Sequence, residues 1–364
     1  MFYIFFSTKW LLIEKKIVIL LNIWRKKIQL MNMRKIQKIL LALAMFIAAS
    51  QTVNAQDFVF SQFYANPLYL NPALAGSKVC PRISLNYRNQ WPALVSSFQT
   101  VSVSYDQYID ALHGGIGAII MNDRQGDHGA LMTTMAGIMY SFRFQLSRYT
   151  YVNAALQMSL VNMNLNWDNL RFPDQIDPTF GFIYPTQATQ PDNLNKWYLD
   201  FDAGAVIYSD AWYAGAAVSH LTQPSNGFYG ISDLPMKFTV HGGGLINLAT
   251  DKRRTSSLAL GTPIISPNLI YQYQGGFNYF NYGLYLDWEP FIVGTWFRHG
   301  LENADAFIFL VGLQHNWFKI GYSYDVTVSK LANNTAGSHE ISLGFTLPCP
   351  EHKKKIRAVR CPSF

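Results

Sequence analysis

A two-residue alternation of apolar and polar side chains recurs from about Pro81 to Leu347, and it constrains the fold more than any other feature. Val101, Val103 and Tyr105, for example, alternate with small or acidic side chains. Because successive side chains of a β-strand point to opposite faces, each such segment has one apolar and one polar face. The pattern therefore predicts an all-β fold.

Fourteen alternating segments are separated by turn residues, and an even number of strands is typical of bacterial outer-membrane barrels. We expect strands at Pro81–Trp91, Phe98–Ile109, Gly114–Asp123, Gly129–Phe144, Arg148–Met163, Trp197–Tyr208, Trp212–His220, Pro235–Leu248, Ser256–Ile265, Leu269–Tyr285, Phe291–His299, Asp305–His315, Trp317–Val326 and His339–Leu347. Connections after even-numbered strands are short, such as 249–255, whereas long ones such as 164–196 follow several odd-numbered strands. This parity is typical of barrels with both termini in the periplasm. The sequence thus predicts a transmembrane antiparallel up-and-down β-barrel of about 14 strands over residues 81–348.

Two rival folds share part of this pattern. Membrane-spanning helices are excluded after residue 55, because no later segment approaches the run of about 18 apolar residues that such a helix needs. A soluble β-sandwich shows the same alternation, but the chain contains 21 Tyr and 25 Phe, many of them at the ends of predicted strands. Aromatic side chains gather at both interfaces of a membrane barrel. Composition therefore favours a barrel in the outer membrane.

The N-terminal region has the pattern of an export signal. Basic residues precede the apolar run 39–49, and Ala55 ends a stretch with small or short side chains where a signal peptidase cleaves. We therefore predict a signal peptide over residues 33–55. Residues 1–32 are interpreted as a spurious extension from a start codon assigned too early, the alternative being an inner-membrane anchor.

The positive charge of the chain belongs to this leader. The first 55 residues contain nine Lys and Arg and a single acid, whereas the whole chain has a formal net charge of +7. The exported part is therefore close to neutral. Nucleic-acid binding needs a basic face on the folded protein, so this class of partner is excluded.

The segment 56–80, between the signal and the first strand, is rich in apolar and aromatic residues but is not a regular strand or helix. Pro67 and Pro72 each follow an asparagine, and Asn-Pro steps favour bends. So many apolar side chains on an irregular exported peptide avoid water in one of two ways. They pack inside the barrel as a plug, which we favour, or they cover a docking partner.

The three cysteines allow two disulfides. Cys80 precedes the first predicted strand and Cys349 follows the last, so a bond between them joins the barrel seam. Alternatively, Cys349 pairs with Cys361 and closes the basic tail, residues 349–364, into a loop. The sequence leaves both pairings open. With no Cys-x-x-Cys spacing, no metal or other cofactor is expected.

Catalytic signals are weak. His241 to Gly244 has the composition of a lipase oxyanion loop, but it lies in a predicted strand and no Gly-x-Ser-x-Gly motif follows it. Asp200, Asp202, His220 and His241 are dispersed polar residues that we interpret as a charge network inside the barrel. We therefore expect no enzyme, the alternative being a catalytic group drawn from these residues.

Four motifs in chain order resemble the PorP/SprF family of type IX secretion system outer-membrane proteins. They are Phe60-Ser61-Gln62 with Asn66-Pro67-Leu68 and Asn71-Pro72-Ala73-Leu74-Ala75-Gly76; Asn86-Tyr87-Arg88-Asn89-Gln90-Trp91-Pro92; Gly321-Tyr322-Ser323-Tyr324-Asp325 with Ser329; and Gly337-Ser338-His339-Glu340-Ile341. The tail ending Arg360-Cys361-Pro362-Ser363-Phe364 is similar to the branch associated with gliding and surface adhesins.

The resemblance implies a non-enzymatic barrel that works with the type IX machinery in secreting cargo, such as adhesins, or in attaching it to the cell surface. Its implied partners are the C-terminal domains of cargo proteins, a periplasmic peptidoglycan-binding protein and outer-membrane lipid. The alternative is a passive channel. The structural or docking positions proposed on this basis are Phe60, Gln62, Asn66, Pro67, Asn71, Pro72, Asp325 and Glu340.

Overall fold

The computed structural model describes residues 57–78, 80–94, 96–248, 263–301, 303–329 and 335–349. They all belong to one compact unit, Asn54–Phe364. Across these residues, no helix combines the length and the apolar character needed to cross a membrane. The predicted signal peptide, the extension before it and residues 350–364 of the tail lie outside the described residues.

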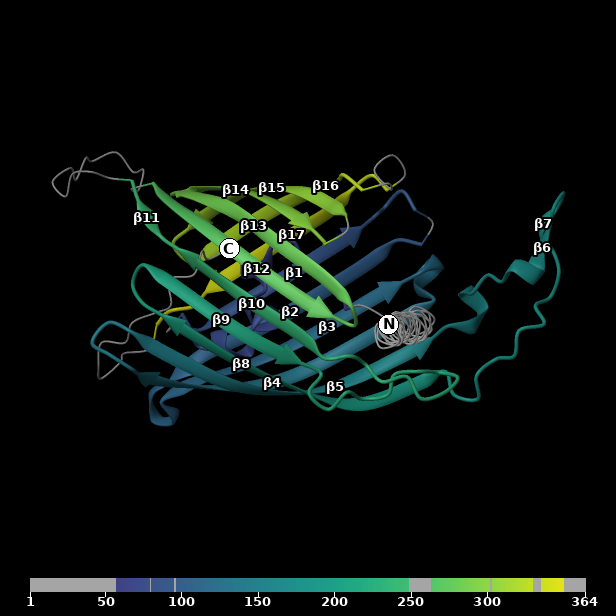
Figure 1. Ribbon diagram of the computed structural model, residues 1–364, viewed down its shortest axis with the longest axis horizontal. Coiled ribbons are helices and arrows are strands. Elements are labelled where there is room, and N and C mark those ends of the chain that lie inside the picture. The colour runs from purple at the N-terminus through teal and green to yellow at the C-terminus, as the bar shows by residue number, and fades with distance from the viewer. Residues whose placement is uncertain are drawn as a thin grey trace, which may run out of the picture. The chain divides into compact units, whose positions relative to one another are not determined.

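The described chain forms a closed antiparallel barrel (Figure 1). The long strands are β1 (Arg82–Gln90), β2 (Phe98–Ile109), β3 (Gly114–Gln125), β4 (Leu131–Gln145), β5 (Tyr151–Leu165), β8 (Asn195–Tyr208), β9 (Trp212–Ser219), β10 (Lys237–Gly244), β12 (Ile264–Gln274), β13 (Phe277–Trp288), β14 (Phe291–His299), β15 (Ala304–His315), β16 (Phe318–Thr327) and β17 (Ser338–Thr346). The two-residue β11 (Ile246–Asn247) continues β10 along β12, so the 15-stranded sheet has a wall of fourteen strands. The ring closes where β1 pairs with β17. The predicted fold class and strand number are confirmed.

One stretch of the strand assignment is wrong. We expected one strand over Leu269–Tyr285, but the structure has a hairpin there, formed by β12 and β13. The turn residues Gly275 and Gly276 both have positive φ, 54° and 92°, which suits a tight two-residue hairpin turn. Because aromatic residues alternate on both sides of these glycines, the pattern has no visible break at the turn.

The preceding connection is also longer than predicted. It joins β11 to β12 over residues 248–263, whereas a short turn was expected at 249–255. The stretch 249–262 lies outside the described residues, together with most of the expected strand Ser256–Ile265.

The barrel has two different ends. One end, the short-turn rim, carries the connection after every second strand of the wall, beginning with the β2–β3 turn, which contains the 3-10 helix η3 (Asp110–Leu112). The other end, the long-loop rim, carries the connections 166–194 and 220–236. The first of these contains η5 (Trp167–Asn169), η6 (Pro173–Gln175), β6 (Ile176–Asp177) and β7 (Gly181–Phe182). A short helix, η4 (Asp127–Gly129), lies between β3 and β4 at the same rim.

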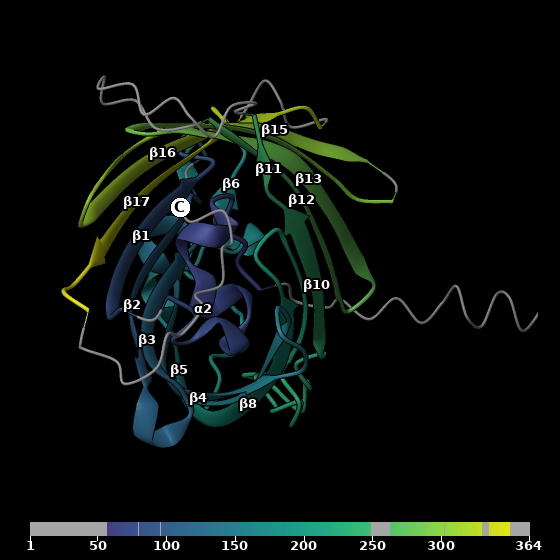
Figure 2. The same cartoon turned by 90° about the vertical axis from the view of Figure 1, so that its left-hand side faces the viewer.

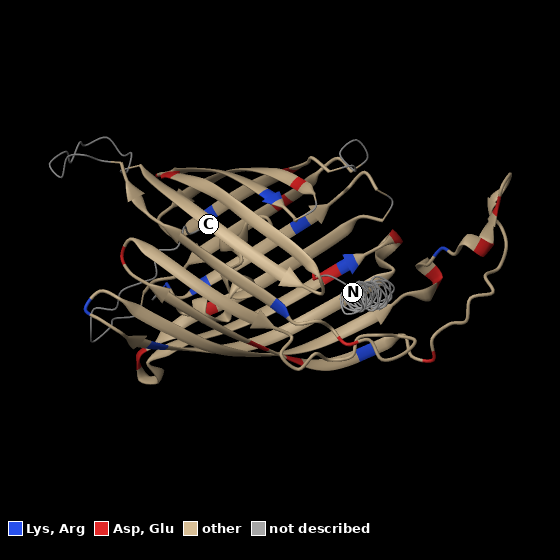
Figure 3. Cartoon of the chain, in the orientation of Figure 1, with Lys and Arg blue, Asp and Glu red and all other residues tan. Residues whose placement is uncertain are grey.

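The two faces of the wall differ in polarity as the alternation predicts. In β2, Val101 and Val103 are exposed on the outside, whereas Ser102 and Ser104 are buried on the inside. Figure 3 shows that few charged residues interrupt the strands. An apolar outer face beside lipid and a polar inner face are the expected division in a membrane barrel.

Residues 57–77, which we call the inner segment, lie within the ring of strands (Figure 2). This segment folds into η1 (Phe63–Ala65), α2 (Pro67–Leu70) and η2 (Pro72–Leu74), three short helices. Proline is favourable at the start of a helix because its fixed φ suits the first turn and its missing N–H is not needed there. The two Asn-Pro steps therefore divide the segment into short turns that fit a narrow lumen.

The inner segment runs from one rim to the other. Asp57 contacts Gln274, at the long-loop end of β12, whereas Gly76 contacts Asp106 near the short-turn end of β2. Asp57 therefore lies near the long-loop rim, whereas Cys349, which follows β17, lies at the short-turn rim.

Candidate functional site

The most elaborate polar site of the described chain holds the inner segment against the barrel wall. Its first anchor is Asp57 at the long-loop rim. The Asp57 carboxylate accepts hydrogen bonds from Lys237 Nζ at 2.8 Å and Gln274 Nε2 at 3.1 Å, and its Oδ2 lies 2.9 Å from His220 Nε2. Burial alone would raise the pKa of this carboxyl, but Lys237 and His220 hold it well below its usual value. Asp57 is therefore a charged latch at the start of the segment.

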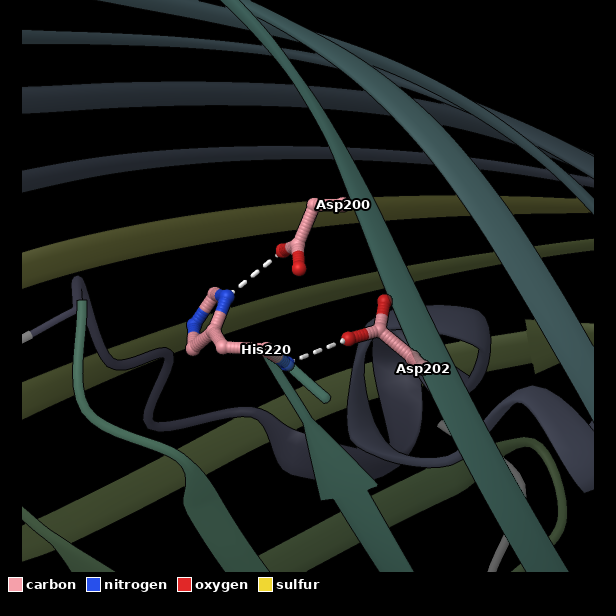
Figure 4. Close-up of side chains that lie close together, drawn as sticks. All are labelled: Asp200, Asp202 and His220. Atoms are coloured by element: carbon pink, nitrogen blue, oxygen red, sulfur yellow. Dashed lines mark hydrogen bonds and ion pairs between the residues drawn. The ribbon is translucent and has the colours of Figure 1, made fainter. Parts of the chain in front are cut away.

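His220 links this latch to the wall. Its Nδ1 lies 2.5 Å from Asp200, and its backbone N–H donates to Asp202 at 3.1 Å (Figure 4). Burial opposes charge on the imidazole, but the carboxylates of Asp57 and Asp200 outweigh it and raise the pKa of His220 to about 10. The ring is therefore protonated at neutral pH and donates from both nitrogens.

Asp200, Asp202 and His220 also offer ligand atoms that lie within 4.8 Å of one another, close enough for a metal ion. Both ring nitrogens of His220 already face carboxylates, Nδ1 that of Asp200 and Nε2 that of Asp57. We therefore interpret the group as an ion-pair anchor. Of the residues considered for catalysis, His241 is not part of it, since its Nε2 lies 3.0 Å from Asn71 of the inner segment.

A second anchor lies inside the wall at Glu340 and Asp325. Glu340 accepts the backbone N–H of Ser61 at 2.7 Å and that of Gln62 at 3.0 Å. Asp325 accepts the Ser61 hydroxyl at 2.6 Å. The two carboxylates thus satisfy backbone and side-chain donors of an irregular peptide that has no regular helix or sheet to do so.

Two arginines balance these buried carboxylates. Arg88 bridges Asp325 at 2.9 Å and Glu340 at 3.1 Å, and Arg298 contacts Asp325 at 3.1 Å. Arg88, Asp325 and Glu340 are each at most 2 % exposed, so all three charges depend on their partners. Removing one member would leave an uncompensated charge in the barrel interior.

The asparagines of the two Asn-Pro steps form the third anchor. Asn66 Nδ2 donates to the hydroxyl of Ser102 at 3.0 Å. Asn71 Nδ2 donates to the carbonyl oxygens of Ala205 at 3.2 Å and Ala216 at 3.1 Å, while its Oδ1 accepts the Ala73 N–H at 2.9 Å. Each amide joins a bend of the inner segment to the wall.

Apolar packing fills the space between these polar anchors. The Phe63 ring lies 5.5 Å from Trp296, and Tyr64 meets Tyr213 edge-on with centroids 5.9 Å apart. Phe60 is buried and meets Tyr69 edge-on at 5.5 Å. Aromatic side chains of this size dominate buried contacts. The segment is therefore packed against the wall as well as hydrogen-bonded to it.

The inner segment ends at the short-turn rim with a close backbone contact. Gly76 has φ of +63°, and a Cβ there would lie 2.5 Å from the Cα of Gly115. Its N–H donates to Asp106 at 2.8 Å, and Asp106 is also paired with Arg82. Only glycine combines this conformation with this approach.

A disulfide bond lies shortly after the inner segment in the chain. Cys80 is bonded to Cys349, with their Cα atoms 4.4 Å apart. The bond joins the chain before β1 to the chain after β17 and so lies at the seam of the barrel. Cys361, the alternative partner of Cys349, lies outside the described residues.

Two of the cavities beside the inner segment lie near the long-loop rim. One of about 480 Å³ is lined by Asp57, Val59, Trp91 and Phe277, among others. The other, of about 140 Å³, is lined by Asp57, Tyr69 and wall residues including His220. Because inner-segment residues line both cavities, movement of the segment would reshape the space inside the barrel.

Sequence reasoning named six inner-segment positions together with Asp325 and Glu340, and the structure brings all of them into the lumen. It missed Asp57, Arg88, Lys237 and Arg298. Alternation alone could have placed Arg88 on the inner face, where a charged residue needs a partner. The sequence has no signal for which carboxylate that partner is.

Several solved structures are similar to this chain at low sequence identity. Omp33 of Acinetobacter baumannii is 7% identical over 74% of this chain and 99% of that one, with a TM-score of 0.41. The toluene transporter TbuX of Ralstonia pickettii is 11% identical over 77% of this chain and 93% of that one, with a TM-score of 0.44. Among curated proteins, no match to the chain is found.

A family model is the decisive comparison. Residues 52–345 match the family described as "Type IX secretion system membrane protein PorP/SprF". The match covers the inner segment and nearly the whole barrel, and a membrane protein with a closed barrel and an apolar outer face is an outer-membrane β-barrel. The chain therefore belongs to the PorP/SprF family of type IX secretion system membrane proteins.

Proposed function

We propose that this protein is a plugged, non-enzymatic barrel that helps the type IX machinery to secrete cargo proteins, such as adhesins, or to attach them to the cell surface through their C-terminal domains. One observation carries the proposal. The inner segment occupies the lumen of a chain that belongs to a secretion family. Glu340 and Asp325 of the wall bind it, and its own Asp57 pairs with Lys237.

The alternative, a passive channel, requires an open lumen. Here the inner segment contacts opposite sides of the ring, since Ser61 binds β16 and β17 while Asn71 contacts β8, β9 and β10. A polar solute crossing the barrel would have to displace packed aromatic side chains. The occupied lumen therefore favours a role in binding other proteins over diffusion of small solutes.

In this proposal the short-turn rim faces the periplasm and the long-loop rim faces the cell exterior, as in other outer-membrane barrels. Residues 33–55 are removed during export, and the basic tail, 349–364, remains in the periplasm. There the tail contacts a periplasmic protein such as one that binds peptidoglycan. Its similarity to the gliding and adhesin branch supports adhesins as cargo.

Two measurements test the proposal. The tagged protein is purified in mild detergent from its native outer membrane, and the proteins that accompany it are identified by mass spectrometry. We expect secreted proteins with a shared C-terminal domain, or a periplasmic peptidoglycan-binding protein. Recovery of the barrel alone, together with steady conductance of the wild-type protein in planar bilayers, would overturn the proposal in favour of the channel.

A deletion of residues 58–75 tests the role of the inner segment. We expect the shortened protein to reach the outer membrane but to lose its partners or its stability. Normal partner recovery by this variant would contradict a role for the segment in partner binding.

A further inference from the structure

The two longest connections between described strands form one joined structure at the long-loop rim. We call residues 166–194 and 220–236 the loop pair. The Tyr229 hydroxyl donates to the carbonyl of Thr189 at 2.7 Å, and Lys196 Nζ donates to the carbonyl of Gly227. These two contacts tie the second loop to the first loop and to the start of β8, and Figure 1 shows β6 and β7 projecting beyond the ends of the barrel strands.

Large apolar side chains project from the loop pair. Ile231 is 91% exposed, Phe180 75% and Tyr229 68%. Phe182, Ile183 and Tyr184 are also exposed. Apolar groups on the strands face lipid, but these side chains lie on connections at the rim, and four of them fall within residues 180–184. A cluster of exposed apolar side chains outside the lipid-facing wall marks an interaction site.

The tip of the first loop is ordered locally. Asp177 accepts the backbone N–H groups of Thr179 at 2.7 Å and Phe180 at 2.9 Å, and the Tyr184 hydroxyl at 2.9 Å. Asp174 accepts the Gln187 N–H at 2.6 Å. The carboxylates thus hold Phe180 outward in a fixed turn, which lowers the entropic cost of binding.

The charge of the loop pair restricts the class of partner that it can bind. It contains the acids Asp168, Asp174, Asp177, Asp192 and Asp233, but Arg171 is its one Lys or Arg. The Arg171 guanidinium lies over the Phe182 ring, 5.6 Å from its centroid. A second copy of this chain would present the same acidic loops and be repelled, as would anionic lipid headgroups.

We propose that the loop pair is a docking surface for a different protein, whose contacting face is apolar and bordered by Lys and Arg. This inference rests on the proposed function, because it places the contact with a secreted partner at the long-loop rim. Phe180 and Ile231 supply the apolar contact. Asp192 and Asp233 attract the basic residues at the border of the partner's contacting face.

The first experiment identifies the partner in living cells. A photo-crosslinking phenylalanine analogue replaces Phe180 in the full-length protein, and adducts are identified by mass spectrometry. The matched control replaces Leu301, which is 71% exposed on the β14–β15 connection at the same rim. We expect a protein adduct at position 180 that is absent at position 301. Adducts only with lipopolysaccharide or with another copy of this chain would overturn the proposal, as would no adduct.

The second experiment measures binding of that purified protein to the detergent-solubilised barrel. We expect Phe180→Ser with Ile231→Ser, and separately Asp192→Lys with Asp233→Lys, to weaken binding by about tenfold or more. The charge variant should also reduce the dependence of the association rate on salt. Leu301→Ser should bind like the wild type. Unchanged affinity in both double variants would overturn the proposal.

The outcomes separate this inference from the function on which it rests. If cargo accompanies the Phe180→Ser, Ile231→Ser variant as it does the wild type, the docking surface is wrong and the function stands. If cargo accompanies neither protein, the function itself fails.

Discussion

Ser61 and Glu340 are hydrogen-bonded inside the barrel although 279 positions separate them in the chain, with the Ser61 N–H donating to Glu340 Oε2 at 2.7 Å. The bond joins the inner segment to β17, the last strand of the barrel wall. Together with the Gln62 N–H, it makes one carboxylate the acceptor for two consecutive backbone donors. The inner segment therefore acquires this anchor only when β17 is present.

Glu340→Gln should loosen the inner segment. The amide keeps the size of the carboxylate, but it loses the charge paired with Arg88 and offers one acceptor oxygen in place of two. We expect docking of the segment to weaken by about 1–3 kcal/mol, seen as more frequent open events in planar-bilayer recordings. Glu289→Gln, at the exposed β13–β14 turn, is the matched control. Recordings that match the wild type would show that Glu340 does not hold the segment.

Gly204→Ala should displace the bend at Asn71. A Cβ on Gly204 would lie 2.1 Å from Asn71 Oδ1, so the amide has to leave its place between Ala205 and Ala216. We expect faster cleavage within the inner segment by an added protease. Gly230→Ala is the control, since its Cβ meets nothing within 4 Å. Equal cleavage rates in the two variants would contradict the prediction.

Removing the seam disulfide should lower the stability of the barrel without preventing its closure. Cys80 and Cys349 are 269 positions apart, so their bond restricts the unfolded chain strongly. We expect the double Ser variant to lose roughly 2–5 kcal/mol and to unfold at a lower temperature in heat-shift gels without reductant. Cys361→Ser should behave like the wild type. An equal loss of stability in Cys361→Ser and in the double variant would mean that Cys349 pairs with Cys361.

The strength with which His220 holds Asp57 at the long-loop rim should depend on pH. Asp57 and Asp200 raise the pKa of His220 from its usual 6.5 to about 10 against the effect of burial. A raised pKa means that this contribution to stability is fully present below pH 6.5 and is lost as the pH rises through about 10. We expect conductance to increase between pH 9 and 11, while His220→Gln conducts at all these pH values and lacks the step. A step of the same size in His220→Gln would assign it to another group.

Much of the barrel wall could be predicted because each strand is specified by residues that are neighbours in the chain. Strands Phe98–Ile109 and Phe291–His299 have the predicted bounds, since alternation and flanking turn residues specify them without reference to neighbours. The error over Leu269–Tyr285 has a local cause too. Gly275 and Gly276 interrupt a run whose aromatic alternation continues on both sides, so periodicity alone hides the turn.

The sequence by itself determined that the chain is a membrane barrel with a polar interior, and that the apolar segment 56–80 avoids water. Only the tertiary structure decided that this segment crosses the lumen from Asp57 to Gly76, and that Glu340, Asp325 and Lys237 hold it. The physical reason is how far apart in the chain the interacting residues lie. Strand patterns arise from neighbours in the chain, whereas buried ion pairs form between residues that meet only when the ring of strands closes.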